Sequence, residues 1–217
     1  MRQVVRSALV IAAAAALAVA WQALAAEPEQ QPPDPGKPDA EPAKVRKAFA
    51  FTLEDQNGKK VSFSTFRKKI VVLEWLDPDS PECLRHYKAG TYKAVLDKLK
   101  GKNKQRVVWL AINSDVYGTA ETNKKFAQEY KVPYQILDDC AGRVGKIYGI
   151  KVSPTILIKA PDGSIAYSGA VDDDPKGEKE EPLNYVAQAL DELIEGKAIS
   201  VAETEPYGTA IPYNRRR

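Results

Sequence analysis

The sequence predicts an α/β domain in which a central mixed sheet is flanked by helices. Two continuous apolar runs, "KIVVLEWL" and "QRVVWLAINS", have the composition of strands that are covered on both faces. A helical pattern follows each run, and strands that alternate with helices are typical of an α/β sheet. Later, two β-rich runs flank Asp162-Gly163, which predicts an antiparallel hairpin at the sheet edge.

The first element is an N-terminal β-hairpin, in a domain that we expect to start near Arg46. In "AFAFTLEDQNGKKVSF" two short β-like runs flank Asn57-Gly58, the strongest local signal for a hairpin turn. From Pro81 to Leu99, apolar residues recur every three to four positions, which predicts one helix.

The second half of the domain repeats the alternation. The run "TAETNKKFAQEYKV" predicts a helix with Thr119 or Thr122 as its N-cap, and "YQILDD" predicts a short strand. The segment "AGRVGKIYG" predicts a short helix ended by Gly149. The amphipathic run "EPLNYVAQALDELIEGK" predicts a closing helix ended by Gly196.

Residues 1–26 have the pattern of an export signal. A positive start, "MRQVVR", precedes an apolar stretch over residues 8–21 and small residues suited to cleavage after Ala25 or Ala26. The stretch is short for a membrane span of about 20 residues, so we expect cleavage and no stable membrane insertion. An uncleaved anchor is the alternative. We therefore expect the protein in the periplasm or outside the cell.

After the predicted signal, the chain divides into a linker, a domain and a tail. Residues 27–45 are rich in proline, which predicts an extended, solvated linker. Residues 46–200 form the domain, and residues 201–217 form a C-terminal tail. Beyond the signal the chain carries nearly equal numbers of basic and acidic groups, so we expect no nucleic-acid partner.

The stretch "DPDSPECLRHY" places a single cysteine where a redox site would carry two. Cys83 falls in the first turn of the predicted helix, where backbone N–H groups and the helix dipole lower a thiol pKa. Ser80, three residues earlier, cannot attack a disulfide. Any reaction at Cys83 would therefore pass through a sulfenic acid or mixed disulfide that an external partner resolves.

The chain resembles thioredoxin-like proteins of the redoxin, or alkyl-hydroperoxide-reductase, branch. The matching stretches include "FTLEDQNGKKVSFSTF", "VVLEWLDPDSPECLRHY", "YGIKVSPTILI" and "DGSIAYSGAVDD", and the resemblance covers about residues 46–200. It implies a thioredoxin-like fold and thiol oxidoreductase or peroxiredoxin-like antioxidant activity. Similar exported proteins carry cysteines at the positions of Ser80 and Thr209, so the "SPEC" site is a degenerate one.

The resemblance to peroxiredoxins implies that Ser80 would hold a peroxide that Cys83 reduces. The proline and the arginine of that family's site would fall at Leu76 and near Ala166, so two of its four elements are missing. Arg85 is a possible substitute for the missing positive charge.

Glu74 lies inside a predicted buried strand, nine residues before Cys83. Thioredoxins place a buried acid at this spacing, which implies that Glu74 exchanges a proton with Cys83 and has a raised pKa. The alternative is a carboxylate that points to solvent or binds a lysine such as Lys69. The resemblance also implies a cis bond at Ser153-Pro154, close to the reactive helix and lining the substrate groove.

His86 is the only histidine and lies three residues after Cys83, so a charged imidazole there would favour a thiolate. A purely structural histidine is the alternative. One cysteine and one histidine fall short of a zinc or copper site by two ligands or more, although Asp77 and Asp79 could be weak additional ligands. We therefore expect no metal and no other cofactor.

Cys140 is the only possible resolving thiol within the chain. A bridge to Cys83 needs Cα atoms within about 7 Å, and the predicted layout shields Cys83 from the loop of Cys140. We therefore predict two unpaired cysteines.

Two function classes stay open. In the first, the chain is an exported thiol oxidoreductase that uses Cys83 with a thiol reductant or a protein thiol or disulfide as partner. In the second, it is a catalytically inactive thioredoxin-fold binding module. An exposed Cys83 thiol of low pKa favours the enzyme, and a sealed thiol favours the module.

Overall fold

The computed structural model describes residues 47–99 and 101–213, without the side chains of residues 102 and 104. The predicted export signal and the whole of the predicted linker lie outside the described residues, so both stay predictions. Within the described ranges, no helix combines the length and the apolar character that crossing a bilayer requires.

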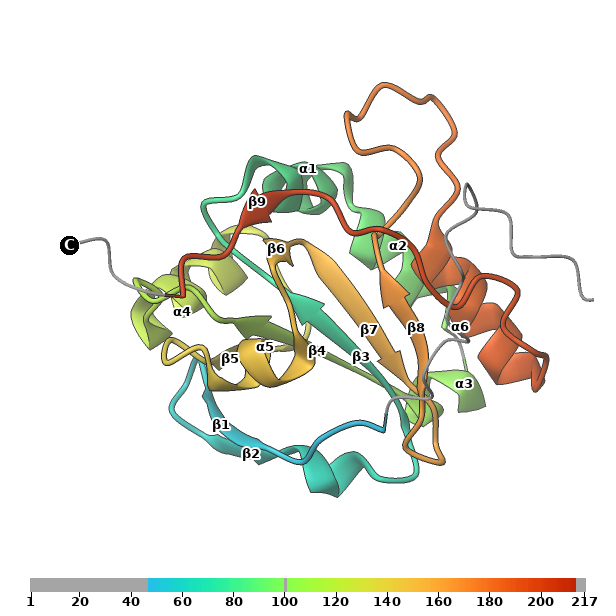
Figure 1. The fold of residues 1–217 in the computed structure, drawn as a ribbon, viewed down its shortest axis with the longest axis horizontal. Coiled ribbons are helices and arrows are strands. Elements are labelled where there is room, and N and C mark those ends of the chain that lie inside the picture. Colours follow the sequence, from blue (N-terminus) through green and yellow to red (C-terminus); the bar gives the residue numbers. More distant parts are fainter. Residues whose placement is uncertain (1–46, 100, 214–217) are drawn as a thin grey trace, which may run out of the picture. The chain divides into compact units, whose positions relative to one another are not determined.

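Among the described residues, seven strands form the predicted central mixed sheet, in the order β2-β1-β5-β4-β3-β7-β8 (Figure 1). Strands β6 and β9 pair separately in a small second sheet. The strands are β1 Thr52–Asp55, β2 Lys60–Ser62, β3 Ile70–Trp75, β4 Val107–Asn113, β5 Gln135–Asp138, β6 Val152–Ser153, β7 Thr155–Lys159, β8 Ile165–Gly169 and β9 Thr209–Ala210.

Helices lie against both faces of the sheet, which confirms the predicted thioredoxin-like α/β fold (Figure 1). One face carries α5, and the other carries α1, α2, α4 and α6. The helices are α1 Pro81–Ala89, α2 Thr91–Lys98, α3 Lys102–Arg106, α4 Ala120–Glu129, α5 Arg143–Tyr148 and α6 Tyr185–Glu195, with a 3-10 helix at Phe63–Phe66.

Strand β3 is the centre of the fold, because it pairs in parallel with β4 and antiparallel with β7. All six of its residues are buried. Val71 and Leu73 pack toward α5, whereas Ile70 and Val72 pack toward α2 and α6. The alternation of side chains along a strand therefore directs Glu74 to the face that α1, α2 and α6 cover.

The helix ends follow the predicted caps. The Thr119 hydroxyl accepts a hydrogen bond from the Thr122 N–H (3.1 Å) and begins α4. Gly149 and Gly196 end α5 and α6 with φ near 70°, the left-handed conformation that glycine adopts at no steric cost.

The helix predicted from Pro81 to Leu99 is instead two helices. Gly90, with φ of 70°, ends α1 and turns the chain into α2. The periodicity of apolar residues continues across this break because both helices bury their apolar sides against the same sheet. Helix α3 and the 3-10 helix carry no periodic signal and were not predicted.

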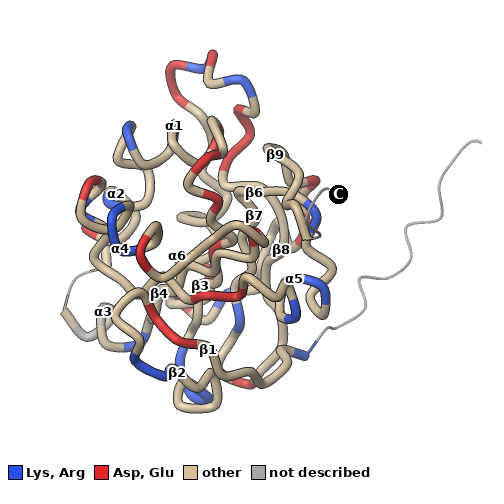
Figure 2. Tube along the Cα trace, turned by 90° about the vertical axis from the view of Figure 1, so that its left-hand side faces the viewer, with Lys and Arg blue, Asp and Glu red and all other residues tan. Residues whose placement is uncertain are grey.

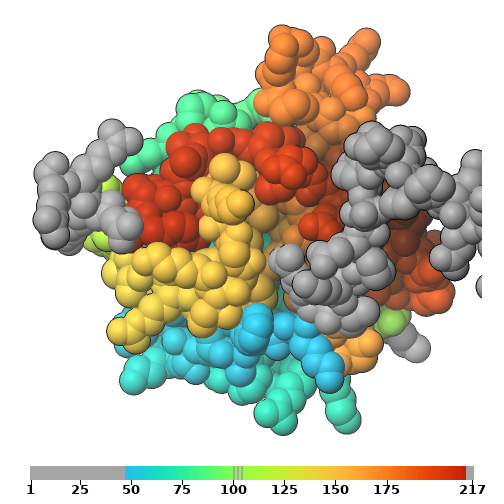
Figure 3. Space-filling model, in the orientation of Figure 1, coloured from blue at the N-terminus to red at the C-terminus, as the bar shows by residue number. Residues whose placement is uncertain are grey.

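Residues 201–213, which the sequence analysis separates from the domain as a tail, return across it and supply β9. In Figure 3 this red segment runs between the green atoms of α1 and the yellow atoms of α5 and β6. Ile211 is 8% exposed, and the Tyr213 hydroxyl donates to the Ile150 carbonyl (2.8 Å). The tail is thus a packed part of the structure.

Candidate functional site

The site lies at the start of α1, where Ser80 is the N-cap and Pro81 the first helical residue. Both residue types suit these positions, because serine accepts from a free helix N–H and proline needs no donor there. The Ser80 hydroxyl accepts from the Cys83 N–H (3.3 Å). It also lies 3.0 Å from Glu82 Oε2 and 3.0 Å from the Ser153 carbonyl oxygen.

Cys83 is in the first turn of α1, as predicted, but its thiol is sealed. Its exposed fraction is 0%, and its Sγ lies 3.1 Å from the Ser153 hydroxyl, which donates to the Trp75 carbonyl (2.9 Å). Burial raises the pKa of Cys83 to about 12, against the lowering effect of its hydrogen bond with Ser153. The helix start therefore does not yield the low thiol pKa that its dipole alone would favour.

Glu74 is fully buried, as the sequence analysis expected, and does not reach Lys69. Three aromatic side chains donate to its carboxylate: Tyr87 (2.7 Å), Trp109 (2.8 Å) and Tyr134 (2.9 Å). Burial raises the pKa of Glu74 to about 6, and these hydrogen bonds oppose the rise. Within the described chain, no hydrogen bond joins Glu74 to Cys83. The carboxylate acts on the thiol through its charge, which raises the Cys83 pKa further.

The Ser153–Pro154 peptide bond is cis, as predicted, and stands opposite the start of α1. Strand β9 occupies the groove beside it. Ser153 pairs with Thr209 and Val152 with Ala210 in antiparallel register, and the Ile211 N–H donates to the Lys151 carbonyl (3.0 Å). The chain's own C-terminal segment thus lies where the resemblance placed an extended substrate.

Glu82 joins the two hydroxyls that replace the expected thiols. The Thr209 hydroxyl donates to Glu82 Oε2 (2.9 Å), and the Ser80 hydroxyl lies 3.0 Å from the same oxygen. Sequence reasoning missed Glu82. An acid in the first turn of a helix reads as a dipole partner, and only the fold shows that Thr209 returns to it.

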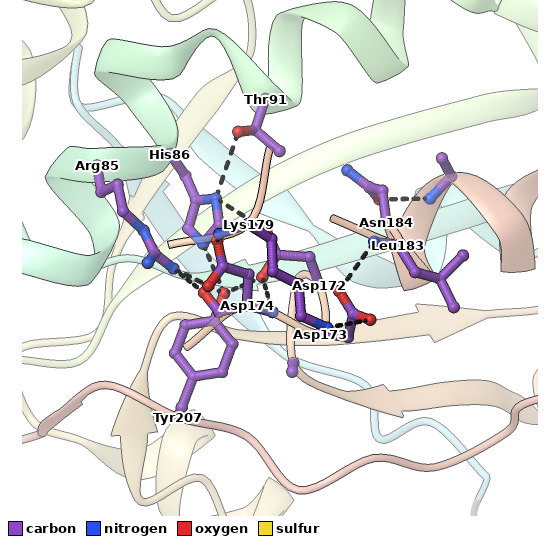
Figure 4. A network of polar contacts seen from close by, with 12 residues as sticks. Arg85, His86, Thr91, Asp172, Asp173, Asp174, Lys179, Leu183, Asn184 and Tyr207 are labelled. Atoms are coloured by element: carbon purple, nitrogen blue, oxygen red, sulfur yellow. Dashed lines mark hydrogen bonds and ion pairs between the residues drawn. The ribbon is translucent and has the colours of Figure 1, made fainter. Parts of the chain in front are cut away.

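His86 and Arg85 face the loop after β8 rather than Cys83. That loop projects from the domain and carries charges of both signs (Figures 1 and 2). His86 Nε2 lies 2.9 Å from the Tyr207 hydroxyl, and Arg85 donates to the Asp174 carbonyl (2.6 Å) and to Tyr207 (3.1 Å). The Tyr207 hydroxyl donates in turn to Asp172 (Figure 4).

This network excludes the charged imidazole that would favour a thiolate. Burial lowers the pKa of His86 to about 4, although the Asp172 charge opposes the shift. His86 is therefore neutral at physiological pH and serves as a hydrogen-bonding residue. Tyr207 is the residue that sequence reasoning missed, because its partners come from α1 and from the β8–α6 loop.

Both cysteines are free, as predicted. Cys140 is exposed in the turn after β5, and its N–H donates to Asp138 (2.9 Å). Burial, with a further contribution from Asp138, raises the pKa of Cys140.

Asp77, Asp79 and Asp115 present carboxylate oxygens within 4.8 Å of one another. Burial and the neighbouring acids raise the pKa of Asp77, and its side chain accepts from the Asp79 N–H (2.8 Å). This cluster closes the turn before α1, and neither Cys83 nor His86 belongs to it.

With this geometry in place, comparison with known proteins identifies the family. The model of the AhpC/TSA family matches residues 45–168. The chain belongs to the AhpC/TSA family. The family match ends within β8, before the β8–α6 loop and before the tail that fills the groove.

Curated proteins similar to this chain include peroxiredoxin Q proteins of plant chloroplasts. The one from Suaeda salsa is 34% identical over 119 residues, which is 54% of this chain and 50% of that protein. The one from Arabidopsis thaliana is 36% identical over 112 residues, 50% of this chain and 48% of that protein. The chain thus spans about half the length of the curated relatives it matches.

Two solved structures share the fold of this chain over a longer stretch than the family match covers. A hypothetical protein from Sinorhizobium meliloti superposes with a TM-score of 0.69 at 19% identity, covering 79% of this chain and 95% of its own. An uncharacterized conserved protein from Geobacillus kaustophilus has the same TM-score at 22% identity, covering 80% and 93%. At these identities the likeness shows the fold alone.

Proposed function

We propose that this chain binds an extended segment of a partner protein in the groove beside Ser153 and Pro154. The pairing of β6 with β9 supports this most directly, because an extended strand already lies along the groove. Pairing with a strand edge is a general way to bind extended peptides, with backbone hydrogen bonds giving affinity and side chains giving selectivity.

We call the arrangement in which β9 pairs with β6 the closed state. In this state the chain's own residues 201–213 occupy the groove. A partner segment has to displace β9, so the closed population lowers the apparent affinity of the partner. The tail therefore acts as an intramolecular competitor.

On this proposal Cys83 is not a nucleophile in the closed state. With a pKa of about 12, roughly one thiol in 10⁵ is ionised at pH 7, and the thiolate is the reactive form. The sulfur is also inaccessible to solvent. By the criterion set from the sequence, a sealed thiol favours a binding module over an enzyme.

A single-thiol peroxidase or thiol oxidoreductase is the second candidate. Membership of the AhpC/TSA family favours it, as does the Ser80 hydroxyl beside the Cys83 N–H (3.3 Å). The Cys83 thiolate would attack one peroxide oxygen and become a sulfenic acid, while the other oxygen would leave as water or an alcohol. A thiol reductant outside the chain would restore Cys83. This reaction requires a site that has opened.

The binding proposal is tested by adding a peptide of residues 201–213 to the full-length Gly208→Ala variant. In this variant the added Cβ should clash with Ser153 and expel β9 from the groove. We expect saturable binding to this variant and none to the wild type. A peptide with proline in place of Ile211 is the matched control, because it cannot donate to Lys151. Equal binding of both peptides, or none to the variant, contradicts the proposal.

Peroxide consumption separates the two candidates. The wild type, Gly208→Ala and Gly208→Ala/Cys83→Ser are compared with hydrogen peroxide and dithiothreitol. Consumption by Gly208→Ala that Cys83→Ser abolishes supports the peroxidase. Equal background rates in all three proteins support the binding module.

We also propose that the protein works outside the cytoplasm, on the strength of the signal-like residues 1–26. To test this, the protein is expressed in a bacterium with an export pathway. Cell fractionation then locates the protein, and N-terminal sequencing shows whether residues 1–26 have been removed. An N-terminus at Met1 in the cytoplasmic fraction would contradict it.

A further inference from the structure

The tail residues 207–213 show which side chains the groove accepts. In an extended segment, alternate side chains point to the same side. Here the odd-numbered residues make the side-chain contacts with the domain, whereas Ala210 is exposed. We call the part of the domain that contacts one such side chain a subsite. The four subsites hold Tyr207, Thr209, Ile211 and Tyr213.

The Tyr207 subsite surrounds the phenol hydroxyl with polar groups. This hydroxyl donates to Asp172, accepts from Arg85 (3.1 Å) and lies 2.9 Å from His86 Nε2 (Figure 4). The Arg85 guanidinium also stands over the ring, 5.6 Å from its centroid, where the face of an aromatic ring attracts a cation. A phenylalanine would fill the space but leave the buried His86 nitrogen without its partner. This subsite therefore favours tyrosine.

The next two positions accept glycine and then a hydrogen-bond donor. The φ of Gly208 is 128°, and a Cβ there would stand 2.7 Å from the Ser153 carbonyl carbon and 3.0 Å from Pro154 Cδ. Only glycine meets both conditions. Thr209 pairs with Ser153, and its hydroxyl donates to Glu82 Oε2 (2.9 Å). A side chain that donates to a carboxylate is thus favoured directly after the glycine.

The Ile211 subsite is part of the hydrophobic core. Ile211 is 8% exposed and belongs to the same cluster of buried side chains as Val144 and Tyr148. Its N–H donates to the Lys151 carbonyl (3.0 Å), which fixes the register of the strand. Burial of an apolar side chain stabilises the bound form in proportion to the area removed from water. This subsite therefore favours a large aliphatic residue.

The Tyr213 subsite depends on two glycines of the α5 region. A Cβ on Gly142 would stand 2.5 Å from Tyr213 Cδ1, and a Cβ on Gly145 would collide with the Tyr213 hydroxyl. That hydroxyl donates to the Ile150 carbonyl (2.8 Å). Glycine inside a helix is destabilising relative to alanine, and at Gly145 this loss makes room for the tyrosine. The subsite therefore favours tyrosine at this distance from the glycine of the segment.

We propose that the groove selects a segment of another protein with the spacing tyrosine, glycine, donor, any residue, aliphatic residue, any residue, tyrosine. This inference rests on the proposed function, because it names the segment that the groove beside Pro154 would bind. Backbone pairing alone accepts any extended segment, whereas subsites at alternate residues select a sequence. The tail fills every subsite in the closed state, so a segment that leaves subsites empty competes poorly with it.

The test uses the full-length Gly208→Ala variant, whose own tail should stay out of the groove, and peptides based on residues 201–213. Titration calorimetry compares the parent peptide with peptides that carry Tyr207→Phe, Gly208→Ala, Ile211→Ala or Tyr213→Ala. We expect each change to weaken binding about tenfold or more. A peptide with Ala210→Gln is the matched control, because Ala210 is exposed, and it should bind as tightly as the parent.

A double-mutant cycle tests the donor position. A Thr209→Val peptide should bind the Gly208→Ala protein about fivefold more weakly than the parent peptide, as expected for one hydrogen bond. This difference should vanish in Gly208→Ala/Glu82→Ala, which lacks the acceptor. A difference that persists without the Glu82 carboxylate overturns the donor assignment.

The remaining outcomes separate this inference from the proposed function. If the parent peptide does not bind, the proposed function fails and this inference fails with it. If the parent peptide binds and the four changed peptides bind equally well, the groove takes extended segments through backbone pairing alone. In that case the sequence preference is overturned and the proposed function stands.

Discussion

Gly208 lies so close to Ser153 that a Cβ atom on Gly208 would stand 2.1 Å from the Ser153 carbonyl oxygen. The φ of Gly208 is 128°, a conformation that other residues rarely adopt. This close approach lets β9 pair with β6 beside Pro154. The absence of a side chain at one position is therefore a condition for closing the groove.

Gly208→Ala should free β9 from the groove. The added methyl group collides with backbone, which cannot rotate away as a side chain can. We expect the Ile211 amide, bonded to the Lys151 carbonyl, to exchange with solvent at least tenfold faster. Hydrogen exchange measured by NMR checks this.

Gly196→Ala is the matched control for that variant. Gly196 also has positive φ, 70°, but an added Cβ would meet nothing within 4 Å. It should cost about 1 kcal/mol of stability from the backbone alone and leave the exchange of Ile211 unchanged. Equal exchange in the two variants would show that the clash at Gly208 does not hold the strand out.

Cys83 should resist alkylation in the native protein, whereas Cys140 should react. The sulfur of Cys83 is sealed, and its pKa of about 12 leaves few thiolates at pH 8. Peptide mass spectrometry after timed iodoacetamide treatment gives both rates. We expect a ratio of at least 100, which should vanish in denaturing urea. Rapid labelling of Cys83 without urea would argue for an open site.

Glu74 should make stability depend on pH in a defined window. Its folded pKa of about 6 lies above its usual 4.5, so between these values the folded state holds a proton that the unfolded state has lost. Stability should therefore fall as pH rises from about 4.5 to 6, by about 2 kcal/mol from this group. The stability difference between wild type and Glu74→Gln, measured by urea unfolding, should change by that amount across the window. A difference between wild type and Glu74→Gln that stays flat across this window would contradict the raised pKa of Glu74.

Tyr207→Phe should loosen the tail just before it pairs with β6. The hydroxyl joins Asp172, His86 and Arg85, so its loss leaves the buried His86 Nε2 without its partner, at a cost of about 1–3 kcal/mol. We expect lower stability in urea and faster exchange at the Thr209 amide. Tyr130→Phe, which removes a hydroxyl beside Glu129 at the end of α4, should have neither effect.

The sequence was enough to predict the sheet, the hairpin, most helices and the cis bond at Pro154. Periodicity, turn residues and the family resemblance act over short spans, and the central strands carry unbroken apolar runs. The end of α1 at Gly90 was not predicted, because α1 and α2 each keep one apolar side and the spacing of apolar residues continues across the break. The location of Cys83 and the burial of Glu74 were also accessible, because both follow from position in the fold.

The sequence did not allow us to predict whether the Cys83 thiol is reactive. A thiol at a helix start is reactive when the helix dipole lowers its pKa more than burial raises it. The segments that bury Cys83 lie far from it along the chain. Thr209 reaches Glu82 from 127 positions away. Tyr207 reaches His86 from 121 positions away, which turns a possible thiol activator into a neutral anchor. No local pattern encodes such contacts.

The separation of β6 and β9 along the chain has a consequence for folding. Ser153 and its partner Thr209 are separated by 209 − 153 = 56 residues. Pairings between distant segments form slowly, because the entropy of closing the loop is lost before the contacts reward it. We therefore expect β6 and β9 to pair after the β1-β2 and β7-β8 hairpins, so the groove beside Pro154 is the last part of the fold to close.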